Sequence, residues 1–198
     1  MRFEWSSAVQ TACAYCQAII VRHDVDLEKV GKVADLPADA SPIQIHTEGV
    51  YENQPFIVIG RIAYSWEQGR WNEWHILFHQ QDRTGWLSDA QAEYAVSFAV
   101  QPPAELPRPE EMHRGRPFLF DNVRYEVMTL TKAHYEGFEG ELPFRTTERE
   151  DILFADLRTA DGRFGTIDYS EAPPLLYLGR FADFDELRLR NLREFEGW

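Results

Sequence analysis

Residues 69–88 read GRWNEWHILFHQQDRTGWLS and combine two strand-like segments, a turn between them and three tryptophans. The segment 71–78 alternates between apolar and polar residues well enough for a half-buried strand. Side chains alternate along a strand, so Trp71 and Glu73 share one face whereas Trp74 points the other way. The stretch therefore predicts an antiparallel hairpin that carries a glutamate among tryptophans.

The same strand pattern recurs after a proline-rich break. Four prolines lie between 102 and 109, which excludes a central strand there and suits an extended linker. On either side of it, 50–58 matches 119–127 at a constant offset, including an acidic residue followed by Asn in the turn. Three further segments match at a larger offset: 76–78 with 152–154, 82–87 with 161–167, and 94–98 with 175–178. The change in offset places an insertion in the second copy, within 136–150.

These matches predict an all-β protein of two similar small antiparallel modules, each barrel-like and SH3-like. We expect a lead-in with a degenerate zinc-knuckle segment over 1–42, a first module over 43–101, a linker over 102–112 and a second module over 113–198. In the lead-in, 26–36 has weak helical spacing. The last segment, 184–198, fits either a closing strand or a short helix.

Composition restricts the classes of partner. The chain of 198 residues carries a formal charge of −13, which disfavours nucleic acid and anionic membrane surfaces as partners. No apolar run approaches the roughly 18 residues of a membrane span, and the first residues do not form a secretory signal. The expected location is therefore the cytoplasm, where cysteines are reduced by default.

Cys13 and Cys16 form a Cys-x-x-Cys knuckle, which is half of a zinc ribbon. A structural zinc site needs four ligands, and no further cysteine exists, although His23 or His46 could substitute. A redox pair is a second interpretation, but the apolar segment after Cys16 favours a strand rather than the helix N-terminus that such pairs prefer. The third interpretation, a reduced remnant that binds no metal, is the expected one.

Several segments together resemble the domain-of-unknown-function family numbered 4178. They are WNEWHILF, DRTGWLSDAQAEY, GELPF, the DYSE turn with LLYLG, and the segment that begins CAYCQAIIVRHDV. The resemblance runs from Cys13 to about Leu192 and keeps the order of the segments. It implies a bacterial protein, often led by a two-knuckle zinc ribbon and often encoded near polyamine-synthesis and membrane-stress genes. This sequence departs from that pattern, because the first knuckle is missing and Gln17 replaces the usual glycine, so the true start lies upstream or the ribbon has decayed.

Six residues form the candidate ligand-binding site: Trp71, Glu73, Trp74, Trp86, Glu141 and Asp168. A carboxylate among indole rings suits a cation or a basic peptide. Two alternatives remain: the tryptophans are core with Glu73 at an edge, or Glu73 is a catalytic acid. For nucleophilic or metal chemistry the candidates are scattered, since no nucleophile elbow occurs and the pair His75 and His79 lacks an evident third ligand.

The function expected from the sequence is a non-enzymatic binding or adaptor role, with a protein or a cationic small molecule as partner. The alternative is an enzyme or a polyamine-binding protein that uses a Trp/Glu pocket. No cofactor is expected, and zinc only if the missing knuckle is supplied. A His or Glu with a perturbed pKa beside Trp86 would favour the enzyme, and an aromatic patch without such groups would favour binding.

Overall fold

The computed structural model describes residues 3–23, 26–32, 36, 39–102, 106–146 and 151–195. Its strands are β1 (Gln10–Ala12), β2 (Ala18–His23), β3 (Asp26–Lys32), β4 (Glu48–Tyr51), β5 (Gln54–Trp66), β6 (Gly69–Phe78), β7 (Arg83–Ala90), β8 (Glu93–Val100), β9 (Pro117–Phe120), β10 (Val123–Leu142), β11 (Asp151–Arg158), β12 (Arg163–Asp168) and β13 (Leu175–Ala182). The helical segments of the described residues are two 3₁₀ turns, η1 (His79–Gln81) and η2 (Pro109–Glu111). Neither turn is long or apolar enough to cross a membrane. The all-β prediction is confirmed, whereas the helical spacing over 26–36 was misleading, because β3 pairs with β2 as a strand.

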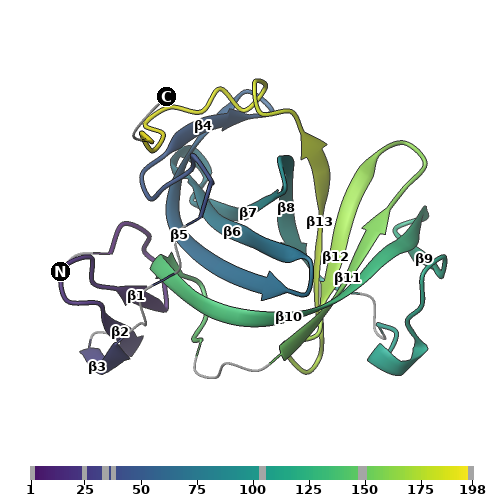
Figure 1. Cartoon of the computed structure of the whole chain (residues 1–198), viewed down its shortest axis with the longest axis horizontal. Helices are drawn as coiled ribbons and strands as arrows, with labels where there is room; N and C mark the ends of the chain where they lie inside the picture. Colours follow the sequence, from purple (N-terminus) through teal and green to yellow (C-terminus); the bar gives the residue numbers. More distant parts are fainter. Residues whose placement is uncertain are drawn as a thin grey trace.

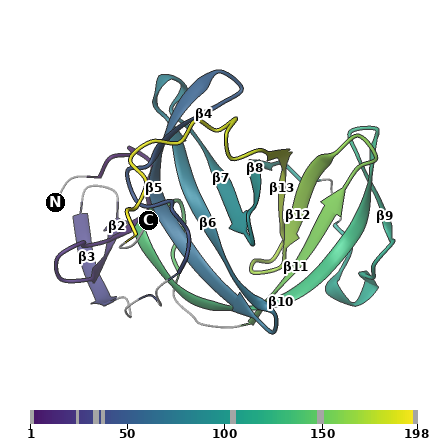
Figure 2. The ribbon, with the colours of Figure 1, turned by 45° about the horizontal axis from the view of Figure 1, so that its top comes forward.

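Eight strands pair in a ring, which we call the central ring. Its order is β5-β6-β7-β8-β13-β12-β11-β10, and it returns to β5 because the long β10 pairs with β11 and then with β5. Figure 1 shows β10 crossing the molecule from β9 to the N-terminal strands β1–β3, and Figure 2 shows β6, β7, β8, β13, β12 and β11 in sequence. All pairings are antiparallel. The two predicted modules thus share one sheet, and a division into two separate SH3-like barrels is not confirmed.

The two halves place the same elements in the same order. Each has a short strand, a two-residue hairpin, a long strand with a bulge and three further strands. In the hairpins, both Glu52-Asn53 and Asp121-Asn122 have positive φ at both residues, which is typical of the type I′ turns that match strand twist. The bulge follows Val58 in β5 and Val127 in β10, at the same offset as the hairpins.

Strand register corrects one of the sequence matches. Val58 pairs with Ile76, and the corresponding Val127 pairs with Leu157, so Leu157 rather than Ile152 corresponds to Ile76. Ile76 and Leu157 belong to buried clusters on the outer face of the ring, whereas Ile152 packs against a cluster on its inner face. Matching the letters Ile-Leu-Phe shifted the register by an odd number of residues, which reverses every side chain. The longer connection after β10, between Leu142 and Asp151, lies within the predicted insertion.

Three apolar clusters hold the sheet together. The outer cluster of the first half includes Trp74, Phe78 and Ile43, and the C-terminal segment adds Leu187 to it. The outer cluster of the second half takes Met112 from the predicted linker, with Leu106 packed against it, so the described part of this linker is packed rather than a free spacer. The C-terminal segment forms turns and a single bridge from Glu48 to Arg190, which is neither of the two structures expected for it.

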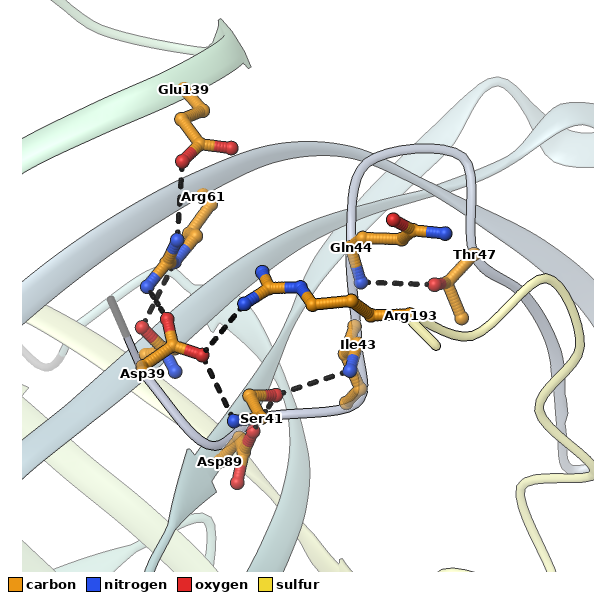
Figure 3. A network of polar contacts seen from close by, with 10 residues as sticks. Asp39, Ser41, Ile43, Gln44, Thr47, Arg61, Asp89, Glu139 and Arg193 are labelled. Carbon is orange, nitrogen blue, oxygen red and sulfur yellow. Dashed lines mark hydrogen bonds and ion pairs between the residues drawn. The ribbon is translucent and has the colours of Figure 1, made fainter. Parts of the chain in front are cut away.

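A polar network on the outer face ties the lead-in and the C-terminal segment to the ring (Figure 3). Arg61 of β5 is 3% exposed and forms ion pairs with Asp39 and with Glu139, the latter at 3.1 Å. Asp39 also accepts a bond from Arg193 at 3.3 Å. Its Oδ1 accepts the backbone N–H of Ser41 at 2.9 Å. The network is satisfied internally and fixes segments that cover the first outer cluster.

Candidate functional site

A cavity of about 620 Å³ lies inside the central ring, a size typical of small-molecule sites. Inward-facing side chains of all eight ring strands line it. It extends from Trp66 and Arg70 beside the β5–β6 turn to Phe144 in the segment after β10. Both halves of the sequence therefore contribute walls to one internal space.

Strand β6 divides the predicted site between two faces of the sheet. Trp71 and Glu73 line the cavity, as their shared face in the sequence predicted. Trp74 points to the outer cluster, where it is fully buried and lies under the Arg61 guanidinium at 5.0 Å. The core interpretation thus holds for Trp74, while Trp71 and Glu73 face the cavity.

Glu73 is held between the indole of Trp71 and the hydroxyl of Ser88. Its Oε1 accepts from Trp71 Nε1 at 3.1 Å, and its Oε2 accepts from Ser88 Oγ at 2.7 Å. Burial nevertheless raises the pKa of Glu73 to about 8, since these two bonds compensate only partly for lost hydration. The neighbouring carboxylates of Asp156 and Asp168 raise this pKa further. Near neutral pH, the Glu73 carboxyl group therefore retains a proton in most molecules.

Two more carboxyl groups face the cavity from the second half. Asp156 Oδ2 accepts from Thr129 Oγ1 at 2.5 Å, and Asp168 Oδ1 accepts the backbone N–H of Ser170 at 2.8 Å. Burial is the main cause that raises the pKa of both groups. The cavity consequently holds three carboxyl groups whose negative charge is poorly solvated.

No arginine or lysine of the described residues forms an ion pair with any of these three carboxylates. Three arginines line the cavity but their residues are exposed: Arg70, Arg114 and Arg158. Arg158 pairs with Glu93 at 3.4 Å and lies over the Phe181 ring at 4.2 Å. Arg158 nevertheless lowers the pKa of Asp156 from beyond ion-pair distance. Protons or a bound cation would reduce the cost of burying these carboxyl groups further.

Aromatic side chains cover much of the remaining wall. Tyr64, Trp71 and Phe154 form a trio in which Tyr64 stacks on Trp71 at 5.0 Å between ring centroids. Trp86 forms a second group, since it lies 5.0 Å from His75 and 6.0 Å from Phe144. Rings of this kind offer their negative faces to a cation and flat apolar surface to a hydrocarbon.

His75 and Glu141 serve the fold at one end of the ring. Nδ1 of the fully buried His75 donates to the Glu141 carbonyl at 2.8 Å, and burial lowers the pKa of His75 to about 4. The Glu141 carboxylate instead accepts the backbone N–H groups of Glu4 at 2.6 Å and Trp5 at 3.0 Å. Glu141 thus fixes the N-terminal segment and does not line the cavity.

The Cys-x-x-Cys segment forms a turn between β1 and β2. The backbone N–H groups of Cys16 and Tyr15 point to the Cys13 sulfur and lower its pKa. Gln17 adopts φ 55°, the conformation that the missing glycine would favour. This turn suits a metal thiolate, but no group of three or more His, Cys, Asp or Glu gathers anywhere in the described part of the chain. Two thiols fill half of a tetrahedral zinc shell. Of the two histidines considered as further ligands, His46 forms a hydrogen bond with Glu4, and the side chain of His23 lies outside the part that the structure describes.

Four of the six candidate residues meet in the cavity: Trp71, Glu73, Trp86 and Asp168. Trp74 and Glu141 face elsewhere. Sequence reasoning missed Asp156, Tyr177 and the aromatic Phe154. Asp156 and Phe154 belong to the alternating segment DILFADLR, so the period-two rule that selected Glu73 could have selected them in β11 as well.

The structure is thus that of an all-β protein whose strands form one ring around a cavity of small-molecule size. Three carboxyl groups without an ion-pair partner among the described residues line this cavity. The chain belongs to the family described as Domain of unknown function (DUF4178), whose model matches residues 44–184. The matched region contains all eight strands of the central ring. No curated protein and no solved structure matches the chain.

Proposed function

We propose that this protein binds an organic cation inside the central ring, without enzymatic turnover. The observation that carries the proposal is the set of three carboxyl groups, Glu73, Asp156 and Asp168, that face one aromatic-lined cavity without an ion pair to a described arginine or lysine. Arg158 acts on Asp156 only beyond ion-pair distance. A bound cation would supply the missing counter-charge. Of the two partners considered from the sequence, we favour a cationic small molecule over a protein, because a cavity of about 620 Å³ has the size of a small-molecule site.

The energies favour a ligand with several contacts. A cation over an aromatic face gains about 0.5–2 kcal/mol, and a hydrogen bond to a charged group contributes roughly 1.5–3 kcal/mol. Micromolar affinity corresponds to about 8 kcal/mol. One ammonium group at one carboxylate therefore does not suffice, and the ligand must also bury apolar surface or carry more than one donor.

The halves, in this proposal, are two copies of one β unit that together enclose the site. Support comes from the shared order of strands, the two type I′ hairpins and the bulges at equivalent positions. A cytoplasmic location and the gene context implied by the family resemblance make polyamines natural members of a test panel. They are not singled out by any contact in the cavity.

The test is a titration of purified protein with spermidine, benzyltrimethylammonium and the anion 3-phenylpropionate, at low and moderate salt. Tryptophan fluorescence and calorimetric heat report binding, because Trp71 and Trp86 line the cavity. We expect at least one cation to bind and the anion not to bind. Asp156→Asn combined with Asp168→Asn should weaken that binding at least tenfold, whereas Asp121→Asn on the β9–β10 hairpin should not. Cation binding that the double variant leaves unchanged, or an absence of cation binding, would refute the proposal.

Acid–base catalysis is a second candidate function, because the criterion set from the sequence for an enzyme is met. Glu73 has a pKa of about 8 in the cavity that Trp86 lines, and His75, whose pKa burial lowers to about 4, lies 5.0 Å from Trp86. A carboxyl group protonated near neutral pH is suited to act as a general acid. The test of catalysis is whether wild-type protein converts a bound ligand to a product and whether Glu73→Gln abolishes that conversion, as followed by product analysis. Recovery of the ligand unchanged after prolonged incubation would leave binding as the sole function.

A further inference from the structure

Corresponding positions in the two halves of the ring carry opposite chemistry. In the first half His75 pairs with Trp86, and the same register positions in the second half hold Asp156 paired with Thr166. The correspondence follows from the bulges after Val58 and Val127, since His75 and Asp156 each pair with the first residue beyond the bulge. Of these four residues, Trp86, Asp156 and Thr166 line the cavity. We call the lining residues Thr129, Asp156, Thr166 and Asp168 the polar wall, and Tyr64, Trp71 and Phe154 the aromatic wall.

From this division, and resting on the proposed function, we infer that the ligand is a primary amine with one ammonium group and a flat apolar body. The ammonium group lies on the polar wall between Asp156 and Asp168. The apolar body lies against Trp71 and Phe154. The cavity is thereby matched to an aryl-alkyl amine rather than to a linear polyamine.

The polar wall is built to receive N–H donors. Asp156, Thr129 and Thr166 sit side by side on β11, β10 and β12, because Asp156 pairs with both threonines. Asp168 lies two residues from Thr166 on the same face of β12, about 7 Å along the strand. The buried Thr166 hydroxyl donates toward the Asp156 carboxylate and lowers the pKa of that group, and it accepts no hydrogen bond from the described residues, so this corner contains an unused acceptor. One ammonium group with three N–H donors satisfies a carboxylate and hydroxyl oxygens together.

The aromatic wall is unsuited to a second ammonium group. Trp71 and Tyr64 are already stacked, with the Phe154 ring edge-on to both, which presents flat apolar surface. Glu73 is the acidic residue on this wall, and both of its oxygens already accept hydrogen bonds, from Trp71 and Ser88. A second ammonium group here would lose hydration and meet a carboxyl group that is mostly protonated near neutral pH.

The test compares 2-phenylethylamine with 2-phenylethanol, 1,4-diaminobutane and spermidine by calorimetry on the full chain at pH 7. We expect 2-phenylethylamine to bind at least tenfold more tightly than each of the other three. Asp156→Asn should weaken 2-phenylethylamine at least tenfold and leave 2-phenylethanol within twofold. Thr166→Val should weaken the amine about three- to tenfold, and Asp121→Asn, on the β9–β10 hairpin outside the cavity, should leave it within twofold. The Asp156→Asn variant replaces a carboxyl group of raised pKa by a neutral isostere, so it is expected to fold.

Three results separate this inference from the proposed function. Tightest binding of spermidine or 1,4-diaminobutane would overturn the single-amine class while the cation site remains. Equal weakening of the amine and the alcohol by Asp156→Asn would overturn the placement of the ammonium group. Failure of every cation in both panels to bind would overturn the inference and the proposed function together.

Discussion

Replacing Glu73 by glutamine isolates the free energy that its buried carboxyl group costs the folded protein. The pKa of Glu73 is about 8 in the folded chain against an ordinary value of 4.5. The folded state therefore holds this proton more tightly than the unfolded state, and stability falls as pH rises through that window. Each pH unit within it lowers the free energy of unfolding by up to about 1.4 kcal/mol.

The full window corresponds to roughly 4–5 kcal/mol at most. Glu73 retains part of its surface facing the cavity, and water there reduces the effect, so we expect about 2–4 kcal/mol. Glutamine keeps one acceptor oxygen for the Trp71 N–H, its amide N–H can donate to the Ser88 hydroxyl oxygen, and it cannot ionise. Glu73→Gln should therefore match wild type at pH 5 and exceed its stability by about 2–4 kcal/mol at pH 8.5.

Urea denaturation at pH 5, 7 and 8.5 measures this difference, with tryptophan fluorescence as the signal. Glu67→Gln, exposed in the β5–β6 turn, controls for the change in net charge. Contributions from Asp156 and Asp168 occur in both proteins and largely cancel. The reasoning is refuted if the free energy of unfolding of Glu73→Gln exceeds that of wild type by the same amount at pH 5 and at pH 8.5. Glu73 would then be solvated, and its charge would not need a ligand.

Two further predictions concern the scaffold. Asp39→Ala removes an ion-pair partner from the buried Arg61 and a hydrogen bond from Arg193; we expect a loss of about 3 kcal/mol in urea denaturation and faster proteolysis of the C-terminal segment, and unchanged proteolysis would contradict the anchoring role. Gly179→Ala places a methyl group 1.8 Å from the Val96 carbonyl oxygen at the pairing of β13 with β8; a loss of about 3 kcal/mol or more is expected, and wild-type stability in thermal denaturation would show that the ring is not closed at this point.

Local rules predicted the strands and turns, since they depend on residues close in sequence. Alternation in 71–78 gave both β6 and the shared face of Trp71 and Glu73. The turns at 52–53 and 121–122 were predicted from an acidic residue followed by Asn, whereas their type I′ geometry is known only from the positive φ of both residues in the structure. By contrast, the weak helical spacing over 26–36 was misleading for residues 26–32, which form β3, because pairing with β2 outweighs local spacing in so short a segment.

The arrangement of the halves was not readable in the same way. Pairing of β8 with β13 and of β10 with β5 depends on contacts between residues far apart in the chain. The sequence of a strand does not by itself indicate which distant strand pairs with it. Two separate barrels and one shared ring use the same alternating strands. The cavity exists only because the two halves share one ring. Sequence comparison therefore could not show that Glu73 faces the cavity whereas Glu141, which looked equivalent, binds the N-terminal segment.

Comparison of register-equivalent positions separates residues that maintain the fold from those that shape the site. Gly85 lies against Phe98, and Gly165 lies against Leu178 in the same relation, with 2.7 Å from an added Cβ to the nearest side-chain atom in each case. Those positions keep their chemistry in both halves because close packing of the outer face requires a glycine. On the inner face the pair His75–Trp86 and the pair Asp156–Thr166 differ completely. Backbone pairing uses no side-chain atoms, so it does not restrict this difference between the halves. The cluster of Thr129, Asp156, Thr166 and Asp168 beside the aromatic side chains of the cavity is therefore the feature that a ligand can recognise.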